Sequence, residues 1–358
     1  MKDLHGGNIY KFQREGKNDI LDYSSNINPL GVPQKFINIA KENFDKLVNY
    51  PDPYYIELRE KIAEFNLVTK DNIIVGNGAT EILFLYIRAL KPKKVLILAP
   101  CFAEYERALK SVSANIDYFE LKESDYFYPN IINLKKEIEN NNYDLLLLCN
   151  PNNPTGQFIK LEDIKEIVKT CENKNTRIFI DEAFIEFIEN WKEKTVSLLK
   201  NKNIFIMRAF TKFFAIPGLR LGYGIGFDDE ILKKMWEEKE PWTVNTFANL
   251  AGIVMLDDKE YIEKSEKWIL EEKKFMYKEL NEFQYINAYK TECNFILIKI
   301  YNISSASLRD KMIEKNILIR DASNFKFLDY HFVRLAIKDR KSNLKMLEVL
   351  ADIMEYRG

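Results

Sequence analysis

The chain has 358 residues, of which 46% are hydrophobic and 30% charged, a composition that suits folded domains with sizeable cores and excludes an intrinsically disordered protein. Its 53 basic and 54 acidic residues leave a net charge of -1, which favours no nucleic-acid partner. The longest apolar runs are too short to span a membrane and the N-terminus lacks the apolar core of a signal peptide, so we expect a cytoplasmic protein without membrane contact. The 2 histidines, and 4 cysteines without a CxxC pair, argue against a metal centre or a disulfide framework.

From about residue 70 onward, short β-rich runs alternate with helical segments. Several of these runs are continuously apolar, which is typical of strands covered by helices on both faces of a sheet. We therefore predict an α/β fold with a mainly parallel sheet, in which ligands bind beyond the carboxyl ends of the strands. The expected strands lie near 73–75, 95–99, 115–121, 144–149, 177–180 and 203–207, and the expected helices near 80–90, 104–111, 131–139 and 161–170.

The pattern changes after Phe227, where a long charged helix is expected over 259–282. Further strands are expected at 293–300, 317–320 and 332–337, and further helices at 305–315 and from 342. We predict three parts: an N-terminal arm over 1–45 that packs on the site and on the small domain, a large domain over 46–240, and a smaller α+β domain over 241–358.

A glycine-containing turn, Gly76-Asn-Gly-Ala-Thr-Glu81, lies between an expected strand and an expected helix. Free N–H groups at the start of such a helix can hold a phosphate. Because no Walker lysine follows, the ligand would be a single phosphate ester. An ordinary turn with Thr80 as the helix cap explains this segment equally well.

Two further features follow expected strands. The loop Asn150-Pro-Asn-Asn-Pro-Thr-Gly156 contains two X-Pro bonds in seven residues, which is more rigidity than a simple turn needs, and it presents side-chain amides. Asp181 ends the strand RIFI and places a carboxylate at the same edge of the sheet. Taken alone, such a carboxylate is more often a cap or a surface group.

Lys212 lies among aromatic residues in Phe210-Thr-Lys-Phe-Phe, and Arg220 follows eight residues later. Poor solvation of an ammonium lowers its pKa and makes the free amine nucleophilic, while a guanidinium suits a phosphate. A lone lysine among phenylalanines more often extends to solvent. A solvent-exposed lysine is the weaker interpretation here, because an acid, an amide loop and a possible phosphate-binding turn precede Lys212 along the chain.

The motifs NPNNPTG (150–156), DEAF (181–184) and TKFFAIPGLRLGYG (211–224) resemble those of the fold-type I enzymes that use pyridoxal 5'-phosphate (PLP), in the class I/II aminotransferase group. The resemblance covers nearly the whole chain. It implies the aspartate aminotransferase-like fold, PLP as cofactor and a homodimer.

The resemblance also implies roles for individual residues. Lys212 would bind PLP covalently and move protons at the substrate Cα, and Asp181 would pair with the pyridinium nitrogen. Asn153 would bond the ring 3' oxygen, and Tyr105 would stack on the ring. The cofactor phosphate would be held by Gly78, Ala79, Thr80, Thr211 and Arg220, and by Tyr50 of the other subunit. Arg334 would hold the substrate carboxylate.

Within this group, HGGN (5–8) and LDYSSNINPLG (21–31) resemble the decarboxylases that act on L-threonine O-3-phosphate in cobamide synthesis. The substrate would be a small phosphorylated amino acid, and the candidates for its phosphate site are His5, Gly6, Gly7, Asn8 and Arg320, with Asn28 ordering the arm. Three alternatives stay open: L-serine O-phosphate as substrate, amino transfer as in the histidinol-phosphate aminotransferases, and a binding protein without catalysis.

Two positions depart from the group. Phe184 stands where a tyrosine is usual, which removes a phenol from the ring 3' oxygen and leaves Asn153 as its main expected partner. Ala209 stands where many relatives have serine or threonine, which removes a hydroxyl from the phosphate site. Neither change removes the core chemistry.

Overall fold

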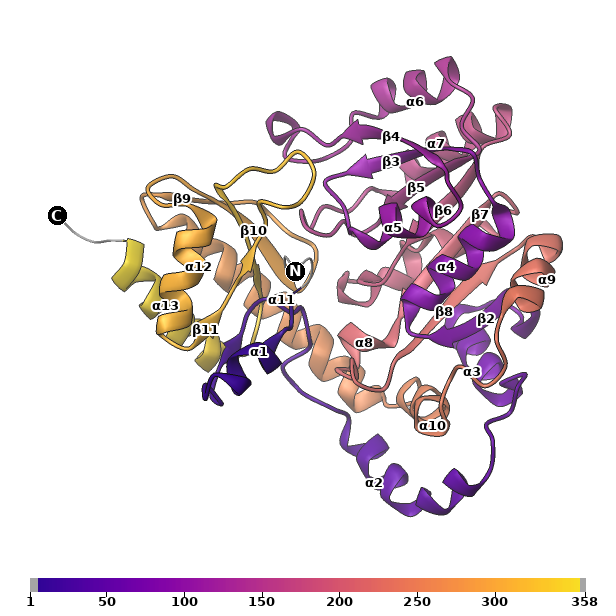
Figure 1. The fold of residues 1–358 in the computed structure, drawn as a ribbon, viewed down its shortest axis with the longest axis horizontal. Coiled ribbons are helices and arrows are strands. Elements are labelled where there is room, and N and C mark those ends of the chain that lie inside the picture. The colour runs from indigo at the N-terminus through magenta and orange to yellow at the C-terminus, as the bar shows by residue number, and fades with distance from the viewer. Residues whose placement is uncertain (1–5, 355–358) are drawn as a thin grey trace.

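The computed structural model of this chain describes residues 6–354 and places them in two lobes, each built around its own sheet (Figure 1). The larger lobe contains a seven-stranded sheet in the order β2-β8-β7-β6-β5-β3-β4. β8 pairs antiparallel with β2 and β7, and the other pairs whose register is given are parallel. These strands are β2 (Ile73–Asn77), β3 (Lys94–Ala99), β4 (Asn115–Glu120), β5 (Leu145–Cys149), β6 (Arg177–Asp181), β7 (Ile204–Ala209) and β8 (Leu221–Gly226).

Helices cover both faces of this sheet, which explains the continuous apolar runs. Along β3, Leu96 and Leu98 belong to one buried cluster, whereas Val95 and Ile97 belong to another on the opposite face. The helices of this lobe are α3 (Ile56–Asn66), α4 (Ala79–Leu90), α5 (Glu104–Lys110), α6 (Ile131–Asn140), α7 (Leu161–Asn173), α8 (Phe210–Phe213), α9 (Asp229–Glu238) and α10 (Thr246–Met255). The predicted α/β fold with a mainly parallel sheet is confirmed.

Strand β8 is the element of this sheet that the pattern of the sequence does not predict. Gly222, Gly224 and Gly226 occupy every second position, and glycine has a low strand propensity. Close packing accounts for two of them. A Cβ on Gly222 would lie 2.3 Å from the backbone nitrogen of Ala79, and a Cβ on Gly224 would lie 2.3 Å from the ring of Phe205.

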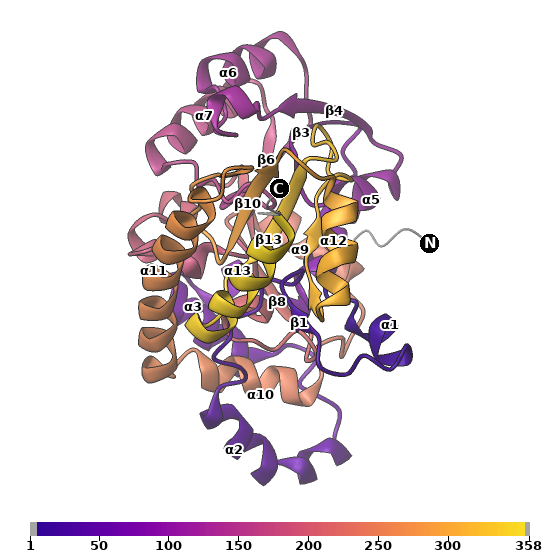
Figure 2. The ribbon, with the colours of Figure 1, turned by 90° about the vertical axis from the view of Figure 1, so that its left-hand side faces the viewer.

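The smaller lobe contains a four-stranded antiparallel sheet in the order β12-β13-β10-β9. Its strands are β9 (Ile286–Ala288), β10 (Phe295–Ile300), β12 (Arg320–Asp321) and β13 (Phe332–Ala336). The helices α11 (Lys259–Asn281), α12 (Ser305–Glu314) and α13 (Arg340–Met354) lie on the outer face of this sheet (Figure 2). The elements predicted after Phe227 are present to within a few residues, whereas β9, α9 and α10 were not predicted.

The N-terminal segment connects the two lobes. It comprises α1 (Ile9–Arg14), β1 (Leu21–Asp22) and α2 (Gln34–Glu42), and β1 pairs in parallel with β11 (Ile317–Leu318). The Tyr23 hydroxyl donates to Asn343 Oδ1 in the small lobe at 2.9 Å, and Asn28 Nδ2 donates to the Phe213 carbonyl in the large lobe at 2.8 Å. The domain limits at 45 and 240 stay predictions.

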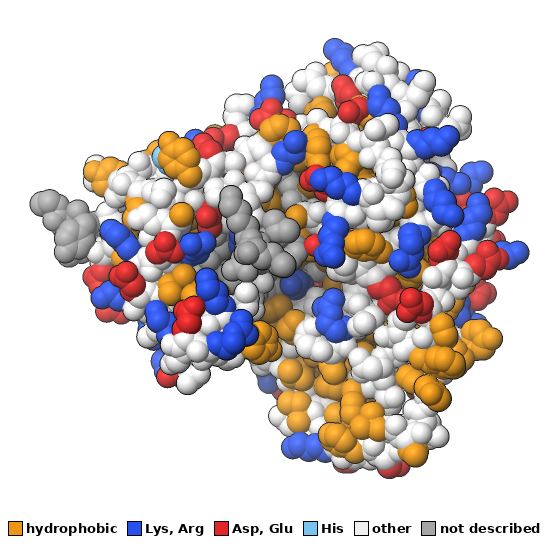
Figure 3. Space-filling model, in the orientation of Figure 1, with side chains coloured by type: hydrophobic (Ala, Val, Ile, Leu, Met, Phe, Trp, Pro, Cys, Tyr) orange, Lys and Arg blue, Asp and Glu red, His pale blue; other side chains and the backbone are white. Residues whose placement is uncertain are grey.

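Apolar side chains gather on the surface over α2 and the segment that follows it (Figure 3). We call this set the α2 surface; its exposed members are Leu30, Val32, Phe44, Leu47, Val48, Tyr50 and Trp242. Among the described residues, no helix is both long and apolar enough to cross a bilayer.

Candidate active site

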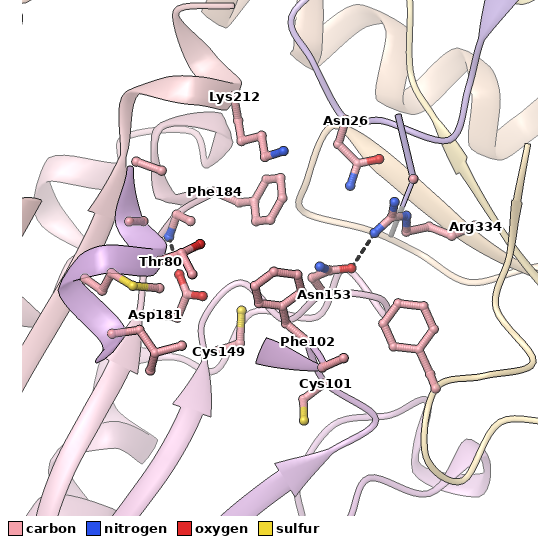
Figure 4. Close-up of a pocket in the computed structure, with 18 of the residues that line it drawn as sticks. Asn26, Thr80, Cys101, Phe102, Cys149, Asn153, Asp181, Phe184, Lys212 and Arg334 are labelled. Atoms are coloured by element: carbon pink, nitrogen blue, oxygen red, sulfur yellow. Dashed lines mark hydrogen bonds between the residues drawn. The ribbon is translucent and has the colours of Figure 1, made fainter. Parts of the chain in front are cut away.

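A cavity of about 440 Å³ lies between the lobes, at the carboxyl ends of the central strands (Figure 4). Strand ends of the large lobe form one wall, and the small lobe and the arm form the other. The cavity brings together ten of the residues predicted from the sequence: Gly6, Ala79, Thr80, Asn153, Asp181, Thr211, Lys212, Arg220, Arg320 and Arg334.

Lys212 and Asp181 point into the cavity from the ends of the neighbouring strands β7 and β6 (Figure 4). Asp181 ends β6, and Lys212 lies in α8, which begins directly after β7. Burial, assisted by the nearby positive charges of Arg334 and Arg220, lowers the pKa of Lys212 to about 8. Burial raises the pKa of Asp181 to about 6, although the hydrogen bonds that its carboxylate accepts oppose the shift. The site thus holds an amine that is easily deprotonated beside a buried acid.

The carboxylate of Asp181 accepts two hydrogen bonds that fix its direction. The Tyr105 hydroxyl donates to Oδ2 at 2.5 Å, and the Ala183 backbone N–H donates to Oδ1 at 2.8 Å. This placement of Tyr105 differs from the predicted ring-stacking role, because Tyr105 is fully buried behind Asp181 and does not line the cavity. Phe102, three residues earlier, lines the cavity, and its ring packs edge-on against Tyr105 at 5.7 Å. A flat ligand in the cavity would meet Phe102.

The turn before α4 and Arg220 form a cup suited to a phosphate. Gly78 has φ +79, and a Cβ there would lie 2.3 Å from Arg220 Nη2, so only glycine leaves room for the guanidinium. The helix begins at Ala79, which places its free N–H groups at the cavity, where Thr80 and Thr211 also line the wall. Ala209 lines the same wall without adding a hydroxyl.

Arg334 lies across the cavity from Asp181 and joins three parts of the chain. Its Nη1 donates to Asn153 Oδ1 at 2.6 Å, and its Nη2 donates to the Ser24 carbonyl at 2.7 Å. Its Nε is buried without a hydrogen-bond partner among residues 6–354, as is Oδ1 of Asn26, which also lines the cavity. Burial and the charge of Arg320 lower the pKa of Arg334 to about 9. A buried donor without a partner indicates a ligand with an acceptor, such as a carboxylate.

Arg320 is the partner of Arg334 in the register of β12 and β13. Its guanidinium donates to the Asp321 carbonyl and to Asn324 Oδ1, both at 2.8 Å, and lies over the Phe325 ring. Lys326, on the loop that follows, also lines the cavity, with its ammonium 4.1 Å from the ring centre of Tyr118. Arg320 in β12 and Lys326 on the loop after it therefore flank the same space as Arg334.

The other predicted residues between 6 and 354 lie outside the cavity lining. Gly7 N–H donates to Ser24 Oγ at 2.7 Å, and Asn8 precedes α1, so both support the arm next to Gly6. Asn28 lies behind Lys212, where its N–H donates to the Lys212 carbonyl, consistent with an ordering role. Tyr50 is 80% exposed on the α2 surface. His5 lies outside the described residues.

The sequence reasoning missed Phe102, Asn26 and Lys326. Phe102 shares the segment PCFAEYE with Tyr105, and choosing between the two aromatic residues requires the rotation of α5, which begins at Glu104. Asn26 lies within the recognised segment LDYSSNINPLG, so its neighbourhood was a usable signal. Lys326 had none, because its place at the cavity depends on the path of a loop.

The residues present fit PLP. Gly78 leaves space for Arg220 at a phosphate site, Lys212 offers a nucleophilic amine, and Asp181 offers a buried carboxylate for a pyridinium nitrogen. Phe184 lines the cavity and packs edge-on against Phe295 at 5.1 Å, so its ring fills space without offering a hydroxyl.

Comparison with known proteins agrees with this fit. The family model "Aminotransferase class I and II" matches residues 18–350. A protein of Caldanaerobacter subterraneus, provisionally named threonine-phosphate decarboxylase, is 44% identical over 98% of this chain and 94% of its own length. The threonine-phosphate decarboxylase of Salmonella typhimurium is 34% identical over 98% of this chain and 96% of its own length. The crystal structure of the histidinol-phosphate aminotransferase from Clostridium acetobutylicum has a TM-score of 0.88 and 38% identity, covering 94% of this chain and 100% of that one.

The chain therefore belongs to the class I and II aminotransferase family, with an aspartate aminotransferase-like fold. It is an enzyme that depends on PLP.

Proposed function

We propose that this enzyme decarboxylates L-threonine O-3-phosphate to (R)-1-amino-2-propanol O-2-phosphate, a component of the nucleotide loop of cobamides. The observation that carries the proposal is the 44% and 34% identity, each over 98% of the chain, to two proteins named threonine-phosphate decarboxylase. L-Serine O-phosphate lacks one methyl group and would be the nearest competing substrate.

The cations of the small-lobe wall support a substrate with two anionic groups. Arg334 and Arg320 are partners on adjacent strands and both line the cavity, with Lys326 nearby. L-Threonine O-3-phosphate carries a carboxylate and a phosphate on one short skeleton, so it would use both arginines at once. We assign the carboxylate to Arg334, whose Nε has no hydrogen-bond partner within the described part of the chain, and the phosphate to Arg320 and Lys326.

The large-lobe wall would hold the cofactor. Lys212 would bind it covalently, Asn153 would donate to its ring oxygen through Nδ2, and Gly78, Ala79, Thr80, Thr211 and Arg220 would surround its phosphate. Bound PLP supplies an electron sink for the pair released when a bond at the substrate Cα breaks. Asp181 would keep the proton on the ring nitrogen. Phe102 would stack on the ring in place of Tyr105, whose hydroxyl instead orients Asp181.

The choice of reaction depends on which Cα bond stands perpendicular to the ring. In a decarboxylation, the carboxylate held by Arg334 would leave as CO₂ and its bonding pair would pass to the cofactor, and Lys212, as the ammonium, would then donate a proton to Cα. In an amino transfer, Lys212 would remove the Cα proton first. Both routes use the same side chains, so the residues of the large-lobe wall do not distinguish them.

A second candidate function is histidinol-phosphate aminotransferase, favoured by the 38% identity to the Clostridium acetobutylicum protein. Histidinol phosphate carries a phosphate but no carboxylate. During that half of the reaction the phosphate would be the one anionic group of the substrate available to Arg334, Arg320 and Lys326, and a carboxylate would reach Arg334 only when glutamate enters. This makes the aminotransferase the weaker fit to the cavity.

We also propose that the enzyme acts as a homodimer in the cytoplasm, joined through the α2 surface. Val48 is 86% exposed and Tyr50 80% exposed, and the Tyr50 ring packs against Trp242 at 4.9 Å, so apolar area is concentrated there. Tyr50 would reach the cofactor phosphate of the partner subunit. Sedimentation of the wild-type protein and of Val48→Glu tests this, since a monomeric wild type would contradict it.

The proposed reaction is tested by incubating PLP-loaded enzyme with L-threonine O-3-phosphate in the absence of any 2-oxo acid. Many equivalents of CO₂ per subunit are expected. No CO₂, together with conversion of the cofactor to its amine form by histidinol phosphate, would replace the proposal with the aminotransferase.

A further inference from the structure

A buried ion pair lies behind the cavity, on the opposite face of the large sheet. Glu182 and Arg208 have fully buried side chains, and Arg208 donates to Glu182 Oε2 through Nη2 at 2.7 Å and through Nε at 3.0 Å. Side chains alternate between the faces of a strand, so Asp181 and Ala209 face the cavity while Glu182 and Arg208 face away from it.

The pair joins the two strand ends that carry the reactive groups. Glu182 directly follows Asp181 at the end of β6, and Arg208 lies four residues before Lys212 at the end of β7. The backbone N–H of Glu182 donates to the Met207 carbonyl at 2.8 Å, so the strands are already paired at this level. The side chains add a second link that is planar and directional.

All three nitrogens of the Arg208 guanidinium donate hydrogen bonds. Nη1 donates to Asn66 Oδ1 and Nη2 also donates to Thr195 Oγ1, both at 2.5 Å, while Glu182 Oε1 accepts from the Val196 N–H at 3.0 Å. The guanidinium carbon also lies 4.7 Å from the Trp191 ring centre. The other titratable groups facing the pair are Glu186 and Tyr223.

Such a pair is an unusual way to stabilise a core. Desolvation of two charges offsets most of their attraction, and apolar side chains of similar volume usually stabilise a fold as well or better. The geometry points to another use for the pair. We propose that Glu182 and Arg208 are positioning residues that fix the placement of Asp181 relative to Lys212, and thereby the position of the PLP ring. This inference rests on the proposed roles of Asp181 and Lys212.

The test replaces both partners at once, Glu182→Leu with Arg208→Met, so that no unpaired charge remains. We expect the unfolding midpoint to stay within about 4 °C of the wild type or to rise. We expect the dissociation constant for PLP to increase about 10-fold or more, and the pH midpoint of the absorbance change of the lysine-bound cofactor to shift by about half a unit or more.

A matched control exists on the same strand. Arg177 begins β6 and pairs with Asp228 at 2.6 Å, at the end of the strand remote from the cavity. The variant Arg177→Met should leave PLP affinity and the pH midpoint at their wild-type values. Arg208→Lys, which keeps the charge but loses the planar fork, should show part of the effect of the double variant.

A folded double variant with wild-type PLP affinity and a wild-type pH midpoint would overturn the inference. If the double variant does not fold, Arg208→Lys keeps a charged partner for Glu182, and the same two readouts decide. The variant Lys212→Ala distinguishes a failure of the positioning inference from a failure of the proposed function. Retention of covalent cofactor in Lys212→Ala would refute the role of Lys212, whereas its loss, with an unaffected double variant, would refute the positioning role alone.

Discussion

The two walls of the cavity are built in different ways. In the large-lobe wall, Asp181 and Lys212 lie at the ends of the adjacent strands β6 and β7. The phosphate cup lies at the end of β2 in the same sheet. In the small-lobe wall, Arg334 lies within β13, Lys326 lies on a loop, and Ser24 comes from the arm. The bond from Arg334 to the Ser24 carbonyl joins residues 310 positions apart. The first wall is a property of the sheet, whereas the second depends on how the lobes and the arm assemble.

This difference assigns separate tasks to the walls. A wall carried by paired strands holds its groups in fixed relative positions, which suits covalent chemistry on a cofactor. A wall gathered from the arm, a loop and a second lobe can change its cations without disturbing that chemistry, which suits the choice of substrate. Variants of the first wall should therefore abolish turnover, and variants of the second should change affinity.

The largest effect is expected for Lys212→Ala. Loss of the amine removes both the covalent attachment of the cofactor and the proton transfer at Cα, so turnover should fall at least about 1,000-fold. Release of CO₂ from L-threonine O-3-phosphate measures it, with Lys345→Ala as a control on an exposed face of α13. A wild-type rate in Lys212→Ala would refute its role.

The second expected effect is a pH-dependent gain in stability for Asp181→Asn in the cofactor-free protein. The pKa of Asp181 is raised from 3.8 to about 6, so the folded state holds its proton more tightly than the unfolded chain. The free energy of unfolding therefore falls as the pH rises from 3.8 through 6. Above pH 6 the buried charge of Asp181 lowers it by about 2–3 kcal/mol relative to the protonated form.

An asparagine carries no charge, so Asp181→Asn should be more stable than the wild type at pH 8 by up to that amount and should lose this advantage at pH 4. Urea unfolding of both cofactor-free proteins at the two pH values measures it. An equal difference at both pH values would contradict the raised pKa. The same variant should bind PLP more weakly, because the ring nitrogen loses its anionic partner.

The third effect concerns the small-lobe wall. Arg334→Gln should weaken binding of L-threonine O-3-phosphate about 30-fold, because a charge-assisted contact to the carboxylate is lost. The decarboxylated product has no carboxylate, and its affinity should change by no more than about 3-fold. Changes in the absorbance of the bound cofactor report both affinities. If the variant binds substrate and product more weakly by the same factor, Arg334 does not bind the substrate carboxylate.

The smallest effect is expected for Lys326→Met. Lys326 is exposed, so a contact to the substrate phosphate is screened by water and its loss should raise KM only about 3- to 5-fold. Lys326→Arg and the surface variant Lys311→Met should behave as the wild type. If Lys326→Met weakens the binding of L-threonine as much as the binding of its phosphate ester, the lysine stabilises the loop through Tyr118 and does not bind the phosphate.

The same contrast explains how much could be predicted from the sequence. Asp181 ends an apolar strand, and Asn153 and Lys212 come within a few residues after two others, so the strand pattern and the motifs place them at one edge of the sheet. Side-chain direction was harder to predict: Tyr105 and Phe102 lie three residues apart, and the structure turns Phe102 to the cavity and Tyr105 to Asp181.

Contacts across the fold were not predictable from local pattern. The partners of Arg334 are Asn153 and Ser24, which belong to the other lobe and to the arm, and no spacing in the sequence relates them. The Glu182–Arg208 pair was hidden for a different reason. Each residue lies in an apolar or motif segment where a buried charge is not expected, and the pairing is revealed only when β6 and β7 lie side by side.

The central claim is that the bond from Cα to the carboxylate breaks while the Cα–H bond stays intact. L-Threonine O-3-phosphate carrying deuterium at Cα tests this directly when the PLP-loaded enzyme turns it over in ordinary water and the products are read by NMR. We expect an amino alcohol phosphate that keeps its deuterium and gains one proton at the same carbon. Release of the deuterium to solvent, with formation of the phosphorylated 2-oxo acid, would contradict it.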